Sequence, residues 1–289
     1  MVKIPTILNA LTVDVEDYFH VEAFASSISP SDWDSCPPRV ETNVRRILAL
    51  FEQHHVKATF FILGWIAARF PDLVRDIAAC GHEVGCHGFD HQHIRRLSAD
   101  EFRDDLRSAR DLLANLARRE IIAYRAPSFS IVKETLWGLD VLAEEGFRID
   151  SSIYPGRHDL YGLPDAPRFP HWRGALFEFP PSTVRLLGNN VGGVGGGYLR
   201  ILPYWWTRWA MKRINRKEKQ PAMVYFHPWE IDPGQPRIRA PLRSRLRHYT
   251  NLAVMESKLN RLLQEFKFDT LSRVCASLDS YGRGTEPRS

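Results

Sequence analysis

Three acidic residues stand at the end of the first apolar run of the chain, which extends from Ile7 to Val15. They are Asp14, Glu16 and Asp17, all within four positions. A strand buries its apolar side chains, so carboxylates placed here need a cation, a metal ion or solvent to compensate their charge. An acidic loop that follows a strand is the simpler interpretation of this cluster.

Histidines form a second cluster, between His82 and His91. His87 and His91 are four residues apart, so one helical turn would bring both imidazoles to the same side, as a shared divalent ion requires. Taken alone the pair is weak support for a metal site, because exposed or hydrogen-bonded histidines are commoner than ligands. A carboxylate from another strand strengthens the prediction.

Two further clusters add a cation and a proton donor. Arg125 lies within the segment from Tyr124 to Phe129, and Asp150 and His227 follow later apolar runs. A buried arginine needs an acidic partner, and a histidine that gives up a proton needs a carboxylate to hold and charge it. A surface salt bridge and a capped helix start are the alternatives.

Short apolar runs alternate with segments of helical periodicity, which predicts parallel strands with helices packed outside them. The predicted strands are residues 7–15, 57–63, 82–87, 121–125, 147–153, 177–179, 223–226 and 268–271. The predicted helices are 40–51, one from Pro71 closed by Gly81, 98–116 behind a capping box, 133–145 and 249–266. All four clusters lie at or just after the carboxyl end of a predicted strand, where parallel α/β barrels gather catalytic groups.

Composition sets the class of protein. The chain has 289 residues, of which 44% are hydrophobic and 25% charged, so it is typical of a folded protein and excludes disorder, collagen and coiled coil. A net charge of +5 suits an anionic partner without indicating nucleic acid. The four cysteines have no C-x-x-C spacing, which excludes a zinc knuckle and a redox pair of that type. We expect one large domain.

The first fifteen residues carry one lysine and no small-residue cleavage site, so they do not resemble a signal peptide. The longest nearly apolar run, from Ala58 to Ala68, has 11 residues, well short of a membrane span. We therefore expect a cytoplasmic protein.

The order and content of the four clusters resemble the polysaccharide deacetylases of carbohydrate esterase family 4, the NodB-like deacetylases. The resemblance is closest to a branch with a D-x-E first motif and a C-terminal extension, found with exopolysaccharide and exosortase gene clusters. It rests on the segments from Asp14 to Phe19 and from His227 to Glu230, and it runs over residues 7–155 and 221–230. It implies one deformed (β/α) barrel of about seven parallel strands over residues 1–289, with 156–220 and 231–289 as elaborations.

The resemblance also implies roles for the acidic and histidine clusters. Asp14 would be the general base, with Arg125 paired to it to keep it ionised. His87 and His91 would be imidazole ligands of a divalent metal ion. Zinc suits such a ligand set best, while cobalt, nickel or manganese could occupy the same site.

The sequence leaves two candidates for the carboxylate that binds the metal ion. The usual first motif has two adjacent aspartates, but here Val15 follows Asp14, so the ligand is Glu16 or Asp17. Residues two apart on an extended strand point to the same side, which favours Glu16. Asp17 becomes the ligand if the chain turns immediately after Val15.

The remaining implied roles concern the leaving group and the acetyl group. The amide of Ser128 would stabilise the oxyanion, His227 would protonate the leaving amine, and Asp150 would hold His227 charged and oriented. Phe129, Tyr154 and Trp229 would form an apolar slot for the acetyl methyl group, or simply pack in the core.

Two later segments have unusual amino-acid compositions. Residues 204–219 combine tryptophans with arginines and lysines, as in an interfacial helix or a sugar-stacking groove. Contact with a membrane surface or lipid-linked glycan is one interpretation of this segment, and a core helix with a solvated basic face is the other. Before this segment, we expect the glycines of 192–197 to be too flexible for the interior of an element, and they match no phosphate-binding loop.

We therefore expect a metal-dependent hydrolase that removes N-acetyl groups from amino sugars of an exopolysaccharide or its precursor, with an N-acetylated glycan as substrate and no nucleic-acid partner. A hydrolase of cyclic amides or imides on the same fold is one alternative. A catalytically silent glycan-binding protein is another, which the joint presence of all the catalytic residue types disfavours.

Overall fold

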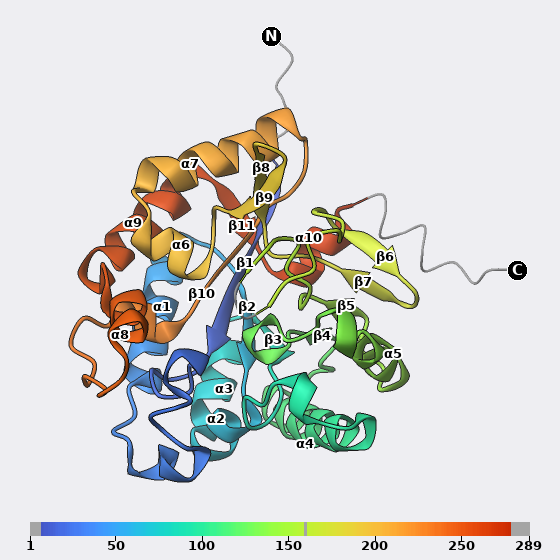
Figure 1. The fold of residues 1–289 in the computed structure, drawn as a ribbon, viewed down its shortest axis with the longest axis vertical. Helices are drawn as coiled ribbons and strands as arrows, with labels where there is room; N and C mark the ends of the chain where they lie inside the picture. The colour runs from blue at the N-terminus through green and yellow to red at the C-terminus, as the bar shows by residue number, and fades with distance from the viewer. Residues whose placement is uncertain (1–6, 159–160, 279–289) are drawn as a thin grey trace, which may run out of the picture.

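A curled, mostly parallel sheet forms the centre of the computed structural model, which describes residues 7–158 and 161–278 (Figure 1). The strand order is β10-β1-β2-β3-β4-β5-β7-β6, and β11 pairs with the start of β1. The strands of this sheet are β1 (Leu8–Val15), β2 (Thr59–Ile62), β3 (Glu83–Cys86), β4 (Ala123–Tyr124), β5 (Ile149–Asp150), β6 (His171–Arg173), β7 (Leu176–Glu178), β10 (Met223–Phe226) and β11 (Lys267–Asp269). Among the described strands of this sheet, β6 alone runs antiparallel to its neighbour. The fold is thus the deformed barrel that the resemblance implies, and within the described residues the path of strands does not close.

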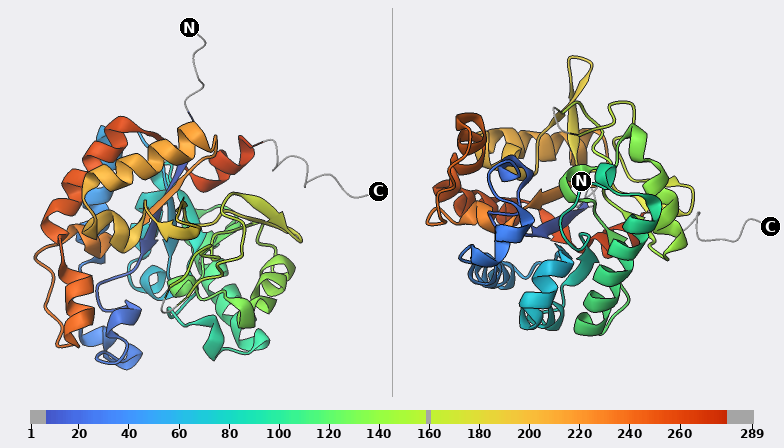
Figure 2. Two further views of the ribbon diagram at one scale, coloured as in Figure 1. Left: turned by 45° about the horizontal axis from the view of Figure 1, so that its top comes forward. Right: turned by 60° about the horizontal axis from the view of Figure 1, so that its bottom comes forward.

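Helices surround the outside of the sheet (Figures 1 and 2). They are α1 (Val40–Gln53), α2 (Gly64–Arg69), α3 (Pro71–Ala79), α4 (Ala99–Ala117), α5 (Trp137–Glu144), α6 (Gly196–Ile201), α7 (Tyr204–Lys212), α8 (Leu242–Tyr249), α9 (Leu252–Glu265) and α10 (Leu271–Ala276). Short 3-10 turns cover Glu22–Phe24, Pro30–Ser35, Ile94–Arg96, Pro127–Phe129, Lys133–Thr135 and Pro228–Ile231, and Arg213–Lys217 is a π-helical turn. A separate hairpin joins β8 (Thr183–Leu186) and β9 (Asn189–Gly192).

Local signals explain the best-predicted boundaries. Ser98 Oγ accepts a hydrogen bond from the Glu101 amide, and the Glu101 carboxylate accepts one from the Ser98 amide, which confirms the capping box of α4. Gly81 has a φ of 77° just after α3, the left-handed conformation that suits glycine at a helix end. The predicted last strand is shorter than expected, because Thr270 caps α10 and ends β11 at Asp269.

The alternation of side chains along β1 sorts them into two cores. Leu11, Val13 and Val15 belong to the main core cluster, which includes the apolar faces of the surrounding helices. Ala10 belongs to a second cluster with Phe61 and other strand residues. Because residues two apart share a face of a strand, Thr12 and Asp14 lie on the same face as Ala10, inside the curl.

The two ranges predicted as elaborations also build the barrel. Residues 156–220 supply β7, which continues the sheet after β5, and residues 231–289 supply β11, which pairs with β1. α10 contributes Leu271 and Cys275 to the inner cluster. The C-terminal half is therefore part of the framework that holds the strand ends.

The glycine-rich run departs from the prediction. It is not merely a loop, since β9 ends at Gly192 and α6 begins at Gly196. α7 follows at once and buries Thr207, Ala210 and Met211 against the main core, while Trp205 is 64% exposed. Among the described residues, no helix is long and apolar enough to cross a bilayer.

Candidate active site

An ion pair sealed inside the barrel joins two of the predicted residues. Arg125, just after β4, donates to Asp14 Oδ1 at 2.5 Å and to Thr12 Oγ1 at 2.8 Å. Its Nη2 donates to Ser151 Oγ at 2.9 Å, and the guanidinium carbon lies 4.3 Å from the centre of the Phe61 ring. Arg125 is wholly buried and Asp14 is 2% exposed, so the pair is largely shielded from solvent.

Glu16 lies among three imidazoles at the carboxyl end of β1. Its Oε2 is 2.9 Å from His91 Nε2, and its Oε1 is 3.1 Å from His227 Nε2. The rings of His87 and His91 have centres 5.6 Å apart. Burial alone would raise the pKa of Glu16, but the nearby His91 and His227 outweigh it and hold that pKa well below its usual range.

Asp17 caps the start of α1 and does not face the histidines. Its Oδ2 accepts hydrogen bonds from the amides of Arg39 at 2.6 Å and Val40 at 2.9 Å, and its Oδ1 accepts one from Tyr18 N. These amides begin α1, whose first N–H groups have no partner within the helix. Of the two carboxylates left open by the sequence, the structure therefore turns Glu16 toward the histidines and uses Asp17 to cap α1.

The donor set suits a divalent cation. His87 Nδ1 donates to the carbonyl oxygen of Arg125 at 2.7 Å, which leaves its Nε2 as the nitrogen with the lone pair. Glu16 Oε2 is buried, and no donor is aligned to it. Two imidazoles and one carboxylate are a common ligand set for zinc. Within residues 7–158 and 161–278, no three His, Cys, Asp or Glu side chains converge closely enough to hold an ion as they stand, so binding requires a side-chain adjustment.

His227 is held by a residue that the sequence analysis did not assign. Its Nδ1 donates to Glu230 Oε2 at 3.0 Å, and its ring stacks on Trp229 at 5.1 Å. Burial opposes a charge on His227, but Glu16, Glu230 and Asp14 together raise its pKa to about 9. Its Nε2 therefore carries a proton and faces Glu16 and Asp14, 3.1 and 3.9 Å away.

The predicted contact between Asp150 and His227 is wrong. Asp150 Oδ1 accepts from Ser152 Oγ at 2.5 Å, and its neighbour in strand register is Glu178 on β7. Both side chains are buried. Burial raises the pKa of both carboxyl groups, and the charge of Asp150 raises the pKa of Glu178 further, so Glu178 holds a proton. The pairing implied by the resemblance fails because Glu230, only three residues after His227, already occupies its Nδ1.

A cavity of about 1020 Å³ opens over these groups. Its lining includes Asp14, Glu16, His87, His91, His227 and Ser128 from the barrel, and residues of α6 and α8 form part of its wall. Ser128 has a φ of 52°, a left-handed conformation that serine adopts only when the surroundings impose it. Such strain at a cavity wall is typical of a functional position.

The three aromatic residues predicted for the acetyl slot separate. Phe129 and Tyr154 pack with Tyr225 in one cluster, and Phe129 lines the cavity. Trp229 also lines the cavity but belongs to another cluster, stacked between His227 and His248. Tyr154 is not among the residues that line the cavity within the described chain.

Sequence reasoning missed two charged residues beside His227. Glu230 lies three positions after His227, a spacing that signals a capping box and could have identified it. Arg200, which contacts Glu230, comes from a short helix after the glycine run, and no local pattern marks it.

Comparison with known proteins agrees with this fold. The fold is shared with a candidate polysaccharide deacetylase from Mycobacterium smegmatis, with a TM-score of 0.62 and 19% identity over 98% of this chain and 93% of that one. Residues 31–148 match the polysaccharide deacetylase family model, and residues 151–276 match a domain of unknown function, DUF3473. The chain therefore contains a polysaccharide deacetylase domain followed by a DUF3473 domain.

Curated relatives match a little over a third of the chain. A peptidoglycan-N-acetylglucosamine deacetylase from Bacillus cereus is 31% identical over 118 residues, 37% of this chain and 43% of the relative. A chitooligosaccharide deacetylase from Bradyrhizobium is 34% identical over 97 residues, 34% of this chain and 42% of the relative. The chain thus covers less than half of the length of either protein.

The buried carboxyl pair predicts a pH effect on stability. In the folded state Glu178 keeps a proton that the unfolded chain releases above the ordinary pKa of 4.5. The free energy of unfolding should therefore fall as pH rises above this value, by at most about 1.4 kcal/mol per pH unit. Glu178→Gln cannot ionise and should flatten this slope in urea denaturation between about pH 5 and 8. Exposed Glu120→Gln is the control, and an equal slope in wild type and Glu178→Gln would contradict the prediction.

Proposed function

We propose that the protein is a metal-dependent N-deacetylase that acts on amino sugars of an exopolysaccharide or its precursor. One observation carries the proposal: Asp14 and His227, a proton acceptor and a proton donor, lie on the wall of one cavity beside the Glu16 and histidine donor set. Relatives named for acetylated glycans support the substrate class.

A divalent ion bound by Glu16, His87 and His91 would supply Lewis acidity, which makes a water acidic and polarises a carbonyl group. The chain's own residues supply the rest. Asp14 accepts the proton of the attacking water, and Arg125 fixes the carboxylate in place by its bond to Oδ1. The backbone amide of Ser128 stabilises the negative oxygen. His227 Nε2–H then protonates the amine that leaves.

The size of the cavity favours a glycan over a small cyclic amide. Its volume of about 1020 Å³ stands at the upper end of the roughly 300–1,000 Å³ usual for ligand sites. A small ring would leave most of this space unfilled. Ring opening of a cyclic imide, or glycan binding without turnover, are the results that would favour the two alternative functions.

Asp14→Asn tests the acceptor role. We expect acetate release from N-acetylated oligosaccharides to fall by about 10²–10⁴-fold, because the amide cannot take the proton of water. The glycan affinity, measured by calorimetry, should change little. Asp111→Asn makes the same chemical change at an exposed site on α4 and should keep full activity. Wild-type protein that releases no acetate from any oligosaccharide would refute the proposal.

Paired variants test the metal carboxylate. Glu16→Gln should weaken Zn²⁺ binding, measured by titration calorimetry, by roughly tenfold or more, since it removes an anionic ligand. Asp17→Asn should keep the affinity but lower the free energy of unfolding by about 0.5–2 kcal/mol, because it weakens the cap of α1. The reverse pattern would assign the ligand to Asp17. Titrations with Co²⁺, Ni²⁺ and Mn²⁺ rank the competing ions.

We also propose contact of residues 204–219 with an anionic membrane surface that carries lipid-linked glycan. Trp205 is the exposed aromatic residue of α7 beside the cations of this segment. Wild type should sediment with phosphatidylglycerol vesicles at low salt, and Trp205→Ala should reduce the bound fraction several-fold. Leu187→Ala, an exposed apolar residue on the β8–β9 hairpin, should not reduce it. Absence of wild-type binding at low salt would refute the contact.

A further inference from the structure

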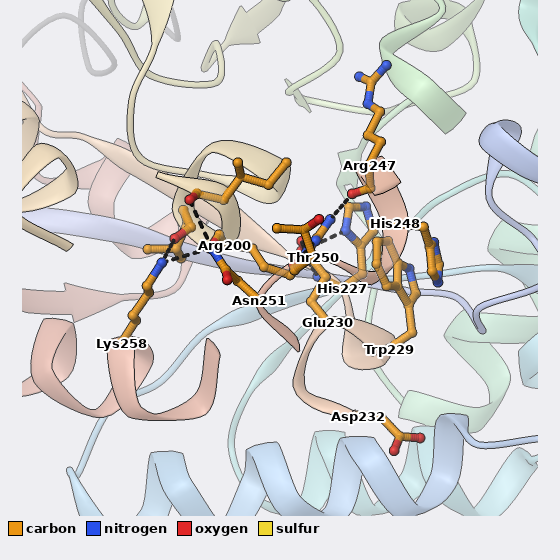
Figure 3. A network of polar contacts seen from close by, with 12 residues as sticks. Arg200, His227, Trp229, Glu230, Asp232, Arg247, His248, Thr250, Asn251 and Lys258 are labelled. Carbon is orange, nitrogen blue, oxygen red and sulfur yellow. Dashed lines mark hydrogen bonds and ion pairs between the residues drawn. The ribbon is translucent and has the colours of Figure 1, made fainter. Parts of the chain in front are cut away.

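A second buried ion pair lies directly behind His227. Arg200 Nε donates to Glu230 Oε1 at 2.9 Å, while Glu230 Oε2 accepts from His227 Nδ1 at 3.0 Å (Figure 3). Arg200 is 1% exposed and Glu230 is wholly buried. The two oxygens of one carboxylate are thus divided between the guanidinium and the imidazole, which forms a continuous chain of charge-assisted bonds.

The guanidinium is fixed from the C-terminal side. Its two terminal nitrogens donate to the backbone carbonyls of Thr250 and Arg247, the latter at 2.7 Å. Lys258 on α9 donates to the carbonyls of Leu199, Arg200 and Leu202, which end α6 (Figure 3). Both the side chain and the backbone of Arg200 are therefore held by residues 247–258.

The glycine run permits this arrangement. A Cβ atom on Gly195 or Gly196 would lie within 2.3 and 2.7 Å of the Tyr225 ring on β10. Real side chains do not approach so closely, so glycine allows α6 to lie against β10. This contact places Arg200 next to Glu230, which lies four positions after Phe226, the last residue of β10.

We propose that Arg200 is a positioning residue for proton donation by His227, an inference that rests on the deacetylase function proposed above. Arg200 acts through Glu230: it fixes the carboxylate that fixes the imidazole, so that Nε2–H faces the cavity. Neither Arg200 nor residues 247–258 needs to contact the reacting atoms. The DUF3473 region thereby takes part in the chemistry of the barrel.

This role predicts a defect that depends on the leaving group. An amine leaves only after protonation, whereas 4-nitrophenolate leaves an acetate ester without a proton donor. Loss of Arg200 should therefore impair amide hydrolysis and spare ester hydrolysis. A general loss of structure would impair both reactions alike.

The experiment compares Arg200→Met and Arg200→Lys with wild type on N-acetylated oligosaccharides and on 4-nitrophenyl acetate. We expect Arg200→Met to lower kcat for the amide by about 10–100-fold, with KM within about twofold and the ester rate within about threefold. Arg200→Lys should recover part of the amide rate, because it restores the charge without the fork of donors. Asp14→Asn should abolish both wild-type reactions, which shows that they share the site.

A matched control and a spectroscopic readout complete the test. Arg168→Met breaks a partly buried ion pair with Glu218 in the same region and should change neither rate. In ¹⁵N-histidine-labelled protein, the downfield Nδ1–H proton of His227 should be visible in wild type and broadened in Arg200→Met. If Arg200→Met does not fold, Glu230→Gln, which keeps the side-chain shape, should show the same amide-specific defect.

The outcomes separate this inference from the proposed function. Wild type without acetate release would refute the deacetylase function itself. An active wild type in which Arg200→Met or Glu230→Gln loses amide and ester hydrolysis equally, or keeps both, would refute the positioning role alone. An unchanged His227 Nδ1–H signal in Arg200→Met would refute it too.

Discussion

The buried pair of Arg125 and Asp14 is the constraint on which the site depends. Both side chains are buried, and loss of either partner would leave an unpaired buried charge, which costs several kcal/mol. Arg125 also bonds to Thr12 and Ser151, so it joins the ends of β1, β4 and β5. The strands must therefore curl enough to bring these ends together, and that curl places Glu16, His87 and His91 around one cavity.

The two halves of the chain supply different groups of the candidate active site. The first half carries the carboxylates and the two histidines at positions 87 and 91, on the ends of β1 and β3. The second half carries His227 with its supports, Glu230 and Arg200, and part of the cavity wall. This proton donor and its supports therefore lie in the DUF3473 region, outside the residues that match the deacetylase family model.

Much of the fold and part of the site could be predicted from the sequence. The strand pattern, the α4 capping box and the period-two argument for Glu16 all rest on local chemistry, which a sequence displays directly. The Asp17 cap could not be seen, because its partners Arg39 and Val40 lie across a loop of more than twenty residues. The role of Arg200 could not be predicted for the same reason, because only the tertiary contact of α6 with β10 brings it to Glu230.

The end of the sheet opposite the cavity has a consequence for how the chain folds. β1 pairs with β2 soon after synthesis, but its partners β10 and β11 lie more than two hundred residues further along. Leu271 N donates to Thr59 Oγ1 and Ser272 to Glu83, which seals the bottom of the barrel late. Until β10 and then β11 have been synthesised, one edge of β1 lacks its partners, and an unpaired strand edge is prone to aggregation.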